Sequence, residues 1–439
     1  MNSDHSTANA VERLATRGQI VSWTFFDFAN TAYSVIVVTV IYNRYFTNHI
    51  AGGQRWLWGL AVSISMICAA ALSPPLGAIA DFSRGRKRFL LYFTLASVIC
   101  TALLFFVKEG MVFWGLVLFI IANIGFEGGL VFYDAFLPRI TSKKTYGRVS
   151  GYGFAMGYLG ALAVLVIVDF ILPAATDPDY LFYVRLSFVV AAAFFMIFSL
   201  PMFLAVPEPE GREAPISSFI RSGISQSKKT FQALFVRKEY PAIARFLIAF
   251  FIYNDGILTV IVFAGIFAET ILKMNDRDII VFFATVQTSA ILGSIVFGIV
   301  TDKIGPKKTI TITLVLWILV CVAAFYIQSI AMFYFVAFAA GIAMAASQSA
   351  SRSLMALLTP REHEAEFFGF YDGLCGKASA VIGPLLYGIV SDMTNERIAV
   401  LFIGVFFIVG LAILQGVEEP PRKLEPAMAT AYTRETLRG

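Results

Sequence analysis

Long apolar runs recur along this chain, and short polar segments separate each run from the next. A helix needs about 20 apolar residues to cross the hydrocarbon core of a bilayer. The pattern therefore predicts an all-α membrane protein with twelve transmembrane helices. The expected crossings lie at residues 20–46, 56–80, 88–107, 111–137, 149–173, 181–205, 243–269, 279–300, 308–328, 330–358, 367–390 and 398–417.

The two halves of the chain resemble each other. Gly77–Lys87 (GAIADFSRGRK) recurs as Gly298–Lys308 (GIVTDKIGPKK), and Phe26–Val38 aligns with Phe251–Phe263. Two six-helix bundles in parallel repeat are a transporter architecture, with the solute site near the midplane between them. We therefore expect an N-terminal tail (1–18), an N-terminal bundle (19–205), a linker (206–240), a C-terminal bundle (241–417) and a C-terminal tail (418–439).

Composition supports a membrane protein. Hydrophobic residues make up 58% of the chain and charged residues 14%, whereas soluble domains have about 45–50% and about 25%. The net charge of +5 comes from Lys and Arg in short loops, which alternate with loops poor in both. By the positive-inside rule this alternation predicts a cell (inner) membrane protein with both termini and the linker in the cytoplasm. It accounts for the basic balance without a nucleic-acid partner.

The sequence offers no pattern typical of an enzyme or a metal protein. The cysteines lie inside apolar runs without a CxxC pair, and the three histidines are scattered over tails and loops. We therefore expect no catalytic residues, no metal and no cofactor. The expected partners are a small-molecule solute and membrane lipids, with the transporter acting as a monomer.

The strongest local motif is G-x-x-x-D-x-x-G-x-K-K at Gly298–Lys308, and its weaker copy at Gly77–Lys87 carries one extra residue. This duplicated loop resembles that of the major facilitator superfamily. The resemblance implies the major facilitator fold and a conformational latch on the cytoplasmic side. The alternative is an ordinary positive-inside loop with a capping aspartate. The expected latch residues are Gly77, Asp81, Arg84, Arg86, Asp134, Gly298, Asp302, Gly305 and Lys307.

Several further segments resemble one branch of that superfamily, the vacuolar amino-acid effluxers with the autophagy-related effluxers and their bacterial relatives. They are Trp23–Tyr33 (WTFFDFANTAY), Val131–Ile140 (VFYDAFLPRI), Gly147–Gly160, YNDG at Tyr253–Gly256 and Phe367–Gly388. The resemblance implies efflux of neutral amino acids for the eukaryotic members and an unsettled solute for the bacterial ones. The branch often has Asn where this chain has Asp134, so the resemblance assigns that carboxylate no role.

Polar side chains interrupt two helices of the predicted N-terminal bundle. Asp27 and Asn30 share one helix face with Tyr33 beside it, and Asn30 lies near mid-bilayer. Asn123 and Glu127 share a face of the fourth predicted helix. A carboxyl group at mid-depth favours its protonated form unless a cation is close, so Glu127 is the predicted proton carrier. The alternatives are a polar seam between helices for Asp27 and a buried structural hydrogen bond for Glu127.

Asp134 lies near the cytoplasmic end of the same helix, four residues before Pro138. We expect it to pair with Arg84 or Arg86 as part of the latch.

Polar groups in the C-terminal bundle mirror the first helix. The repeat sets Asp255 against Asn30, which predicts Tyr253, Asn254 and Asp255 as a second wall of the solute site. The cations Arg352 and Lys377 complete the expected binding set. Its members are Asp27, Asn30, Tyr33, Asn123, Glu127, Tyr253, Asn254, Asp255, Arg352 and Lys377.

Lys377 is expected to hold a solute carboxylate or to neutralise Asp255, and Arg352 is a candidate anion anchor. At 3.6 residues per turn, Asp372 lies about 140° around the helix from Lys377, so we expect the two to face different ways.

The sequence thus predicts a secondary active transporter that moves a small zwitterionic solute, an amino acid, by alternating access. Proton coupling is a hypothesis that rests on Glu127. Two alternatives stay open. One is an exporter of drugs or amphiphilic metabolites with the same fold, and the other is a non-transporting membrane sensor.

Overall fold

The computed structural model describes residues 15–420, apart from 175, 209–215, 275, 362 and 381. The predicted tails, 1–18 and 418–439, therefore lie outside the described residues except for 15–18 and 418–420. Within the described ranges the regular structure is helical throughout.

The first half of the chain forms one layer of helices. Its elements are α1 (Arg17–Tyr33), η1 (Ser34–Val40), α2 (Tyr42–Tyr45), η2 (Phe46–Ile50), α3 (Arg55–Ser83), α4 (Arg86–Leu103), η3 (Leu104–Phe106), α5 (Val112–Asp134), α6 (Leu137–Ile140), α7 (Tyr146–Ile171) and α8 (Tyr180–Ala205). The π-helices η1 and η2 continue α1 and α2, so residues 17–50 form one long apolar span.

The second half forms the other layer. After the linker elements α9 (Ile216–Phe231) and η4 (Gln232–Val236) come α10 (Pro241–Leu272), α11 (Asp276–Ile304), α12 (Pro306–Phe325), α13 (Ile330–Leu358), α14 (Glu364–Phe368), η5 (Gly369–Gly376), α15 (Ile382–Met393) and α16 (Glu396–Gln415).

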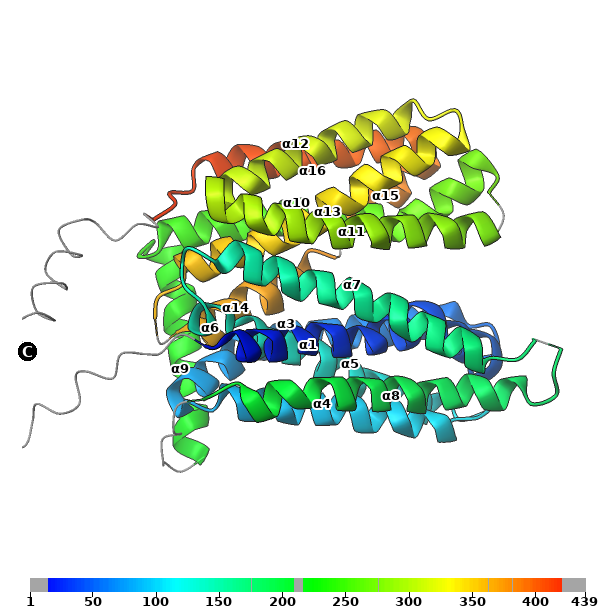
Figure 1. The fold of residues 1–439 in the computed structure, drawn as a ribbon, viewed down its shortest axis with the longest axis horizontal. Helices are drawn as coiled ribbons and strands as arrows, with labels where there is room; N and C mark the ends of the chain where they lie inside the picture. The colour runs from blue at the N-terminus through cyan, green and yellow to red at the C-terminus, as the bar shows by residue number, and fades with distance from the viewer. Residues whose placement is uncertain are drawn as a thin grey trace, which may run out of the picture.

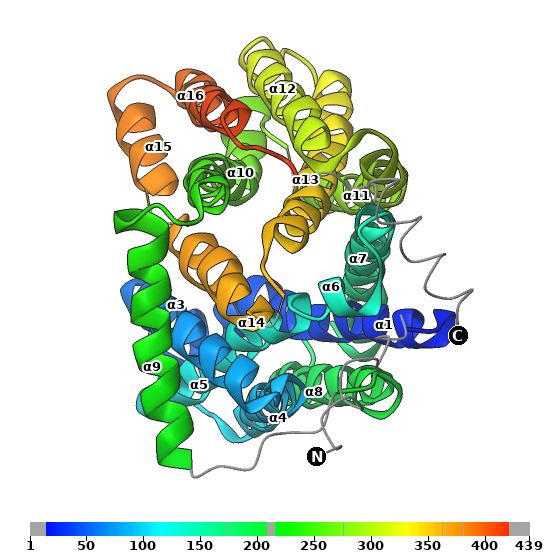
Figure 2. The same ribbon diagram turned by 90° about the vertical axis from the view of Figure 1, so that its left-hand side faces the viewer.

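The long helices of both layers run side by side along the longest axis of the molecule, and α9 crosses them at one end (Figure 1). Seen from that end, α9 lies beside α3 at the edge of the bundle (Figure 2). The start of α1 and the end of α16 lie at the same end, as do the two motif loops at residues 84–85 and 305. We call it the motif end.

The described part of the chain has eleven helices long and apolar enough to cross a membrane, and a shorter apolar helix, α15. The expected crossing at 367–390 is broken into α14, η5 and α15. Its glycines explain the break, because glycine weakens a helix interior and permits close backbone approach. A Cβ added at Gly373 would lie 2.1 Å from the Cβ of Ser73. This element therefore packs backbone-close against α3 of the other half.

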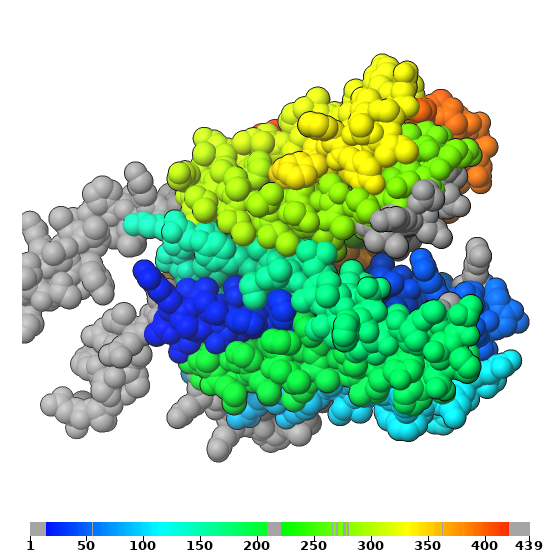
Figure 3. All heavy atoms as spheres, turned by 45° about the vertical axis from the view of Figure 1, so that its right-hand side comes forward, coloured from blue at the N-terminus to red at the C-terminus, as the bar shows by residue number. Residues whose placement is uncertain are grey.

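The two layers meet along a second seam, between α7 and α11. Small residues permit helices to approach closely in lipid, and here a Cβ added at Gly151 would lie 2.2 Å from the carbonyl oxygen of Ser294. The surface atoms of α7 (teal) lie directly against those of α11 (yellow-green) in Figure 3. Contacts across these seams position the charged groups described next.

Candidate functional site

Residues of the first motif bind the opposite half at the motif end. Asp81 accepts hydrogen bonds from the backbone amides of Ala365 (3.1 Å) and Glu366 (2.9 Å) in the first turn of α14. Arg86 donates to Asp81 (2.6 Å) and to Glu364 (2.5 Å). Gly77 makes this approach possible, because a Cβ there would lie 2.2 Å from the carbonyl oxygen of Ala365.

The second motif loop makes the reciprocal contact. Asp302, near the end of α11, accepts hydrogen bonds from the backbone amides of Gly147 (2.8 Å) and Arg148 (3.3 Å) at the start of α7. The guanidinium of Arg148 pairs with the same carboxylate at 2.5 Å. Gly298 packs against Gly147, whose carbonyl oxygen a Cβ at Gly298 would meet at 2.9 Å. Each half thus offers an aspartate to free amides at a helix start of the other.

Three residues predicted for the latch stay within their own half. Arg84 is exposed and ends α3 in the left-handed conformation (φ 54°), and Gly305 (φ 109°) begins α12. The ammonium of Lys307 donates to the carbonyl oxygens of Gln415 and Val417, both at 2.8 Å. The ammonium of Lys87 binds the carbonyl oxygen of Val206 at 2.7 Å in the same way. These lysines cap the last helix of each half.

The expected pairing of Asp134 with Arg84 or Arg86 is wrong. Arg86 already has Asp81 and Glu364 as partners. Asp134 instead forms an ion pair with Arg352 at 2.8 Å. A buried guanidinium needs carboxylates close by, and α13 brings Arg352 to the end of α5.

Arg352 is the centre of a buried cluster that crosses between the halves. Its side chain is 2% exposed and lies 3.4 Å from Asp27, the second carboxylate beside it. It also donates to the hydroxyl (2.9 Å) and the carbonyl oxygen (2.7 Å) of Ser150. The rings of Phe154 (4.2 Å) and Trp23 (5.0 Å) face the guanidinium.

All partners of Arg352 in this cluster come from α1, α5 and α7, whereas Arg352 belongs to α13. Tyr133 supports the cluster by donating to Asp27 at 2.8 Å. Removing one partner of a buried ion pair typically costs about 3–5 kcal/mol. Arg352 therefore holds the halves together inside the membrane, beneath the motif loops.

Lys377 is the centre of a second cluster that joins the halves. Its ammonium forms an ion pair with Glu127 of α5 and lies 3.4 Å from Asp372. The expectation that Asp372 and Lys377 face different ways is therefore wrong. It assumed 3.6 residues per turn, but η5 is a π-helix with i→i+5 geometry, which brings residues five apart onto one face. Lys377 does not serve to neutralise Asp255, since its carboxylate partners are Glu127 and Asp372.

The remaining polar residues of the first half form a network between their own helices. Asn123 donates to the hydroxyl of Ser65 at 2.8 Å and accepts from the hydroxyl of Tyr33 at 3.4 Å. Asn30 donates to Asp27 at 3.4 Å. This network continues from the Arg352 cluster along α1 and α5.

Asn254 and Asp255 bind the broken element of the second half, whereas Tyr253 binds α13. Tyr253 shares a 2.7 Å hydrogen bond with Ser351, and Asn254 donates to Ser379 at 2.7 Å. Both carboxylate oxygens of Asp255 lie 2.8 Å from the backbone amide of Gly383 at the start of α15. Non-helical backbone at membrane depth must have its polar groups satisfied by protein or water. Asn254 and Asp255 thus satisfy polar groups at the helix break.

Sequence reasoning missed Glu364, Ser150 and Tyr133 as partners in these clusters. Glu364 lies outside the long spans. Burial opposes its ionisation, but Arg86 at 2.5 Å and Arg139 at 3.5 Å outweigh that effect and lower its pKa from the ordinary value. An acidic residue next to a predicted basic loop is a weak signal. Ser and Tyr inside apolar runs give none.

The sequence profile of the family described as "Vacuole effluxer Atg22 like" matches residues 58–425. The chain belongs to this family. It is similar to an uncharacterized MFS-type transporter, YxiO, of Bacillus subtilis (strain 168), with 31% identity over 413 residues that cover 91% of this chain and 94% of the relative. Autophagy-related protein 22 of Yarrowia lipolytica is 24% identical over 452 residues, which cover 83% of this chain and 76% of that one.

Solved structures establish the fold of this family member. The proton:xylose symporter XylE superposes with a TM-score of 0.72 at 14% identity, covering 92% of this chain and 96% of that one. The human organic anion transporter MFSD10 gives a TM-score of 0.72 at 13% identity, covering 91% and 99%. The chain is therefore an integral multi-pass membrane protein of the major facilitator type. It is a secondary transporter of the Atg22-like family, not an enzyme, and the expected fold class is confirmed.

Proposed function

We propose that this transporter moves zwitterionic amino acids across the cell membrane by alternating access, coupled to protons. One observation carries the proposal. Lys377 meets Glu127 and Asp372 between the two halves, and transporters of this architecture bind their solutes between their halves. The site offers a cation and carboxylates together, which are the complements of an amino acid's two charged groups.

Recognition works by exchange of ion pairs. The carboxylate of the solute takes the place of Glu127 beside the ammonium of Lys377, and the ammonium of the solute pairs with Asp372, the second carboxylate beside Lys377. The charges stay paired throughout, which avoids the several kcal/mol per ion that an unpaired buried charge costs. A solute with only one of the two charges leaves one partner unpaired.

Glu127 is the proposed proton carrier. Protonation removes the negative charge that competes for Lys377, and the ammonium is then free to hold the carboxylate of the solute. A proton and a solute thus favour each other's binding through Lys377, which is the coupling that a symport cycle needs.

The other predicted site residues take supporting roles in this proposal. Arg352 and Asp27 act as an inner gate, while Asn30, Tyr33 and Asn123 line the N-terminal side. Asn254 and Asp255 position the broken element that carries Lys377, and Tyr253 joins α10 to α13. The reciprocal aspartates, Asp81 and Asp302, act as the latch that keeps the motif end closed.

We propose that the motif end faces the cytoplasm, with both termini on that side. The support is the concentration of Lys and Arg in the loops of that end, as the positive-inside rule requires.

The experiment is uptake of radiolabelled neutral amino acids into proteoliposomes with and without a pH gradient. Lys377→Met should abolish uptake, and Glu127→Gln should leave exchange but remove its dependence on the gradient. Lys108→Met, at an exposed lysine of a short loop, is the matched control. Uptake that survives Lys377→Met would overturn the proposed site. Transport of apolar cations in place of amino acids would favour an amphiphile exporter, and no flux of any solute would favour a sensor.

A further inference from the structure

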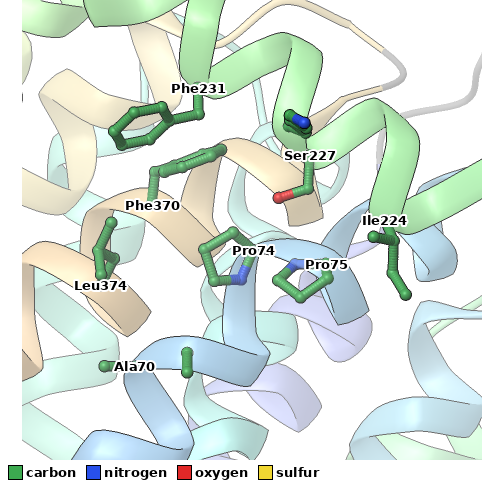
Figure 4. Close-up of a pocket in the computed structure, with 10 residues that line it drawn as sticks. Ala70, Pro74, Pro75, Ile224, Ser227, Phe231, Phe370 and Leu374 are labelled. Atoms are coloured by element: carbon green, nitrogen blue, oxygen red, sulfur yellow. The ribbon is translucent and has the colours of Figure 1, made fainter.

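A cavity of about 360 Å³ lies beneath the linker helix α9, apart from the charged clusters described above. Its walls come from three parts of the chain. Ala70, Ala71, Pro74 and Pro75 belong to α3, Ile224, Ser227, Lys228 and Phe231 to α9, and Phe370 and Leu374 to η5. Figure 4 shows these side chains around the cavity. The volume is within the usual range of about 300–1,000 Å³ for ligand pockets.

The cavity lies where both halves and the linker meet. Gly223 of α9 packs so closely on α3 that an added Cβ would meet the Cγ1 of Ile79 at 2.2 Å. At the other side of the cavity, the rings of Phe231 and Phe370 lie 6.4 Å apart between centroids. An occupant of this space therefore touches the first half, the linker and the second half at once.

The lining is apolar, but it has polar groups in defined places. Pro74 and Pro75 have no backbone N–H, so the carbonyl oxygens of Ala70 and Ala71 lack the amides four residues later that would ordinarily bond to them. The hydroxyl of Ser227 points toward the space between Pro74 and Phe370 in Figure 4. The occupant must combine a long apolar part with a polar end.

The exposed wall residues on α9 indicate the environment of the cavity. Ile224 is 56% exposed and Phe231 is 46% exposed, although the same helix carries Lys228 and Lys229 in its last turn. Exposed apolar groups beside exposed lysines are typical of a helix that lies in the membrane interface. The cavity is therefore open to the lipid layer, and its cation is placed where phospholipid phosphates lie.

We propose that this cavity binds an acyl chain of an anionic membrane phospholipid, with the lipid phosphate at Lys228. The chain packs on the apolar side chains of the three walls. The binding does not depend on what the transporter carries.

Native mass spectrometry of the full-length protein in detergent tests the proposal, with phosphatidylglycerol and phosphatidylcholine as probes. Wild-type protein should retain phosphatidylglycerol preferentially. One interfacial lysine contributes about 1 kcal/mol to anionic-lipid binding, so Lys228→Gln should lower that retention about fivefold. Lys229→Gln is the matched control, because Lys229 is its exposed neighbour but does not line the cavity. Equal losses for both variants would mean that only the surface charge of α9 acts, which overturns the site.

A second pair of variants tests the cavity itself. Ala71→Phe fills it from an exposed edge of α3 and should lower retention of both lipids. Ile67→Phe, one turn away at a residue that is 68% exposed, should not. Melting temperatures in lipid-free detergent confirm that each variant is folded. Unchanged retention in Ala71→Phe refutes occupation by a chain. Full competition by water-soluble glycerophosphoglycerol also refutes it, because that headgroup has no chain.

Discussion

Replacing Arg352 by Met removes the cation that two buried carboxylates share. Asp134 lies 2.8 Å and Asp27 3.4 Å from the guanidinium, and their side chains are only 11% and 12% exposed. Loss of one partner from such a cluster costs about 3–5 kcal/mol. The cost applies to the arrangement closed at the motif end, because separation of the halves lets water reach both carboxylates. At about 1.4 kcal/mol per factor of ten, the closed arrangement should lose between about a hundredfold and a few thousandfold in population relative to the open one.

Distances between spin labels measure this shift. Cysteines at the exposed residues Lys144 and Lys308 place one label on each half at the motif end, in a background without the native cysteines. Arg352→Met should move the distance distribution to longer values. Arg245→Met is the matched control, because Arg245 is exposed and its guanidinium binds the carbonyl oxygen of Gly416 in its own half.

A triple variant decides whether charge is the cause. Adding Asp27→Asn and Asp134→Asn to Arg352→Met removes the unpaired carboxylates, and the distances should return toward those of the wild type. If Arg352→Met leaves the distribution unchanged, or if the triple variant opens as far as the single one, the electrostatic reasoning is wrong.

Three other outcomes follow from the contacts across the halves. Gly373→Ala should destabilise the protein by about 1–3 kcal/mol, because the added Cβ would overlap α3. The melting temperature should fall accordingly. Gly388→Ala is the control and should be neutral, because no atom lies within 4 Å of its added Cβ. Burial opposes ionisation of Glu364, but the charge of Arg86 outweighs burial and lowers the pKa of Glu364. The ionised carboxylate therefore stabilises the fold fully above about pH 4.3. This stabilisation is lost as the pH falls through the lowered pKa. Glu364→Gln should therefore melt at a lower temperature at pH 7 but show a smaller further loss on acidification; an equal loss would contradict this. Asp255→Asn should weaken the cap of α15 by about 1 kcal/mol and speed amide hydrogen exchange in α15, and unchanged exchange would refute the cap.

Apolar length was sufficient to predict eleven of the crossings, since a bilayer sets that length. The crossing expected at 367–390 is instead broken into α14, η5 and α15. Charged groups inside apolar runs are expensive enough to mark functional positions, and Asp27, Glu127, Arg352 and Lys377 all lie in buried clusters.

The partners of those residues could not be predicted, for identifiable reasons. A helical wheel drawn at 3.6 residues per turn gives wrong angles in a π-helix, which has more residues per turn. The π-helix η5 therefore brings Asp372 close to Lys377. The partner of Asp255 is a backbone amide at a helix break, and every residue except proline has such an amide, so no residue type marks it. Asp134 finds Arg352 across 218 residues of sequence, a contact that only the tertiary packing sets.

The reciprocal contacts of Asp81 and Asp302 have a consequence for how this end can be blocked. One aspartate holds the start of α14 and the other the start of α7, so they fasten two different seams between the same two bodies. The motif end can open only when both contacts break. An antibody fragment that clamps either seam should therefore hold this end closed, while loss of Asp81 or Asp302 alone leaves the other contact in place.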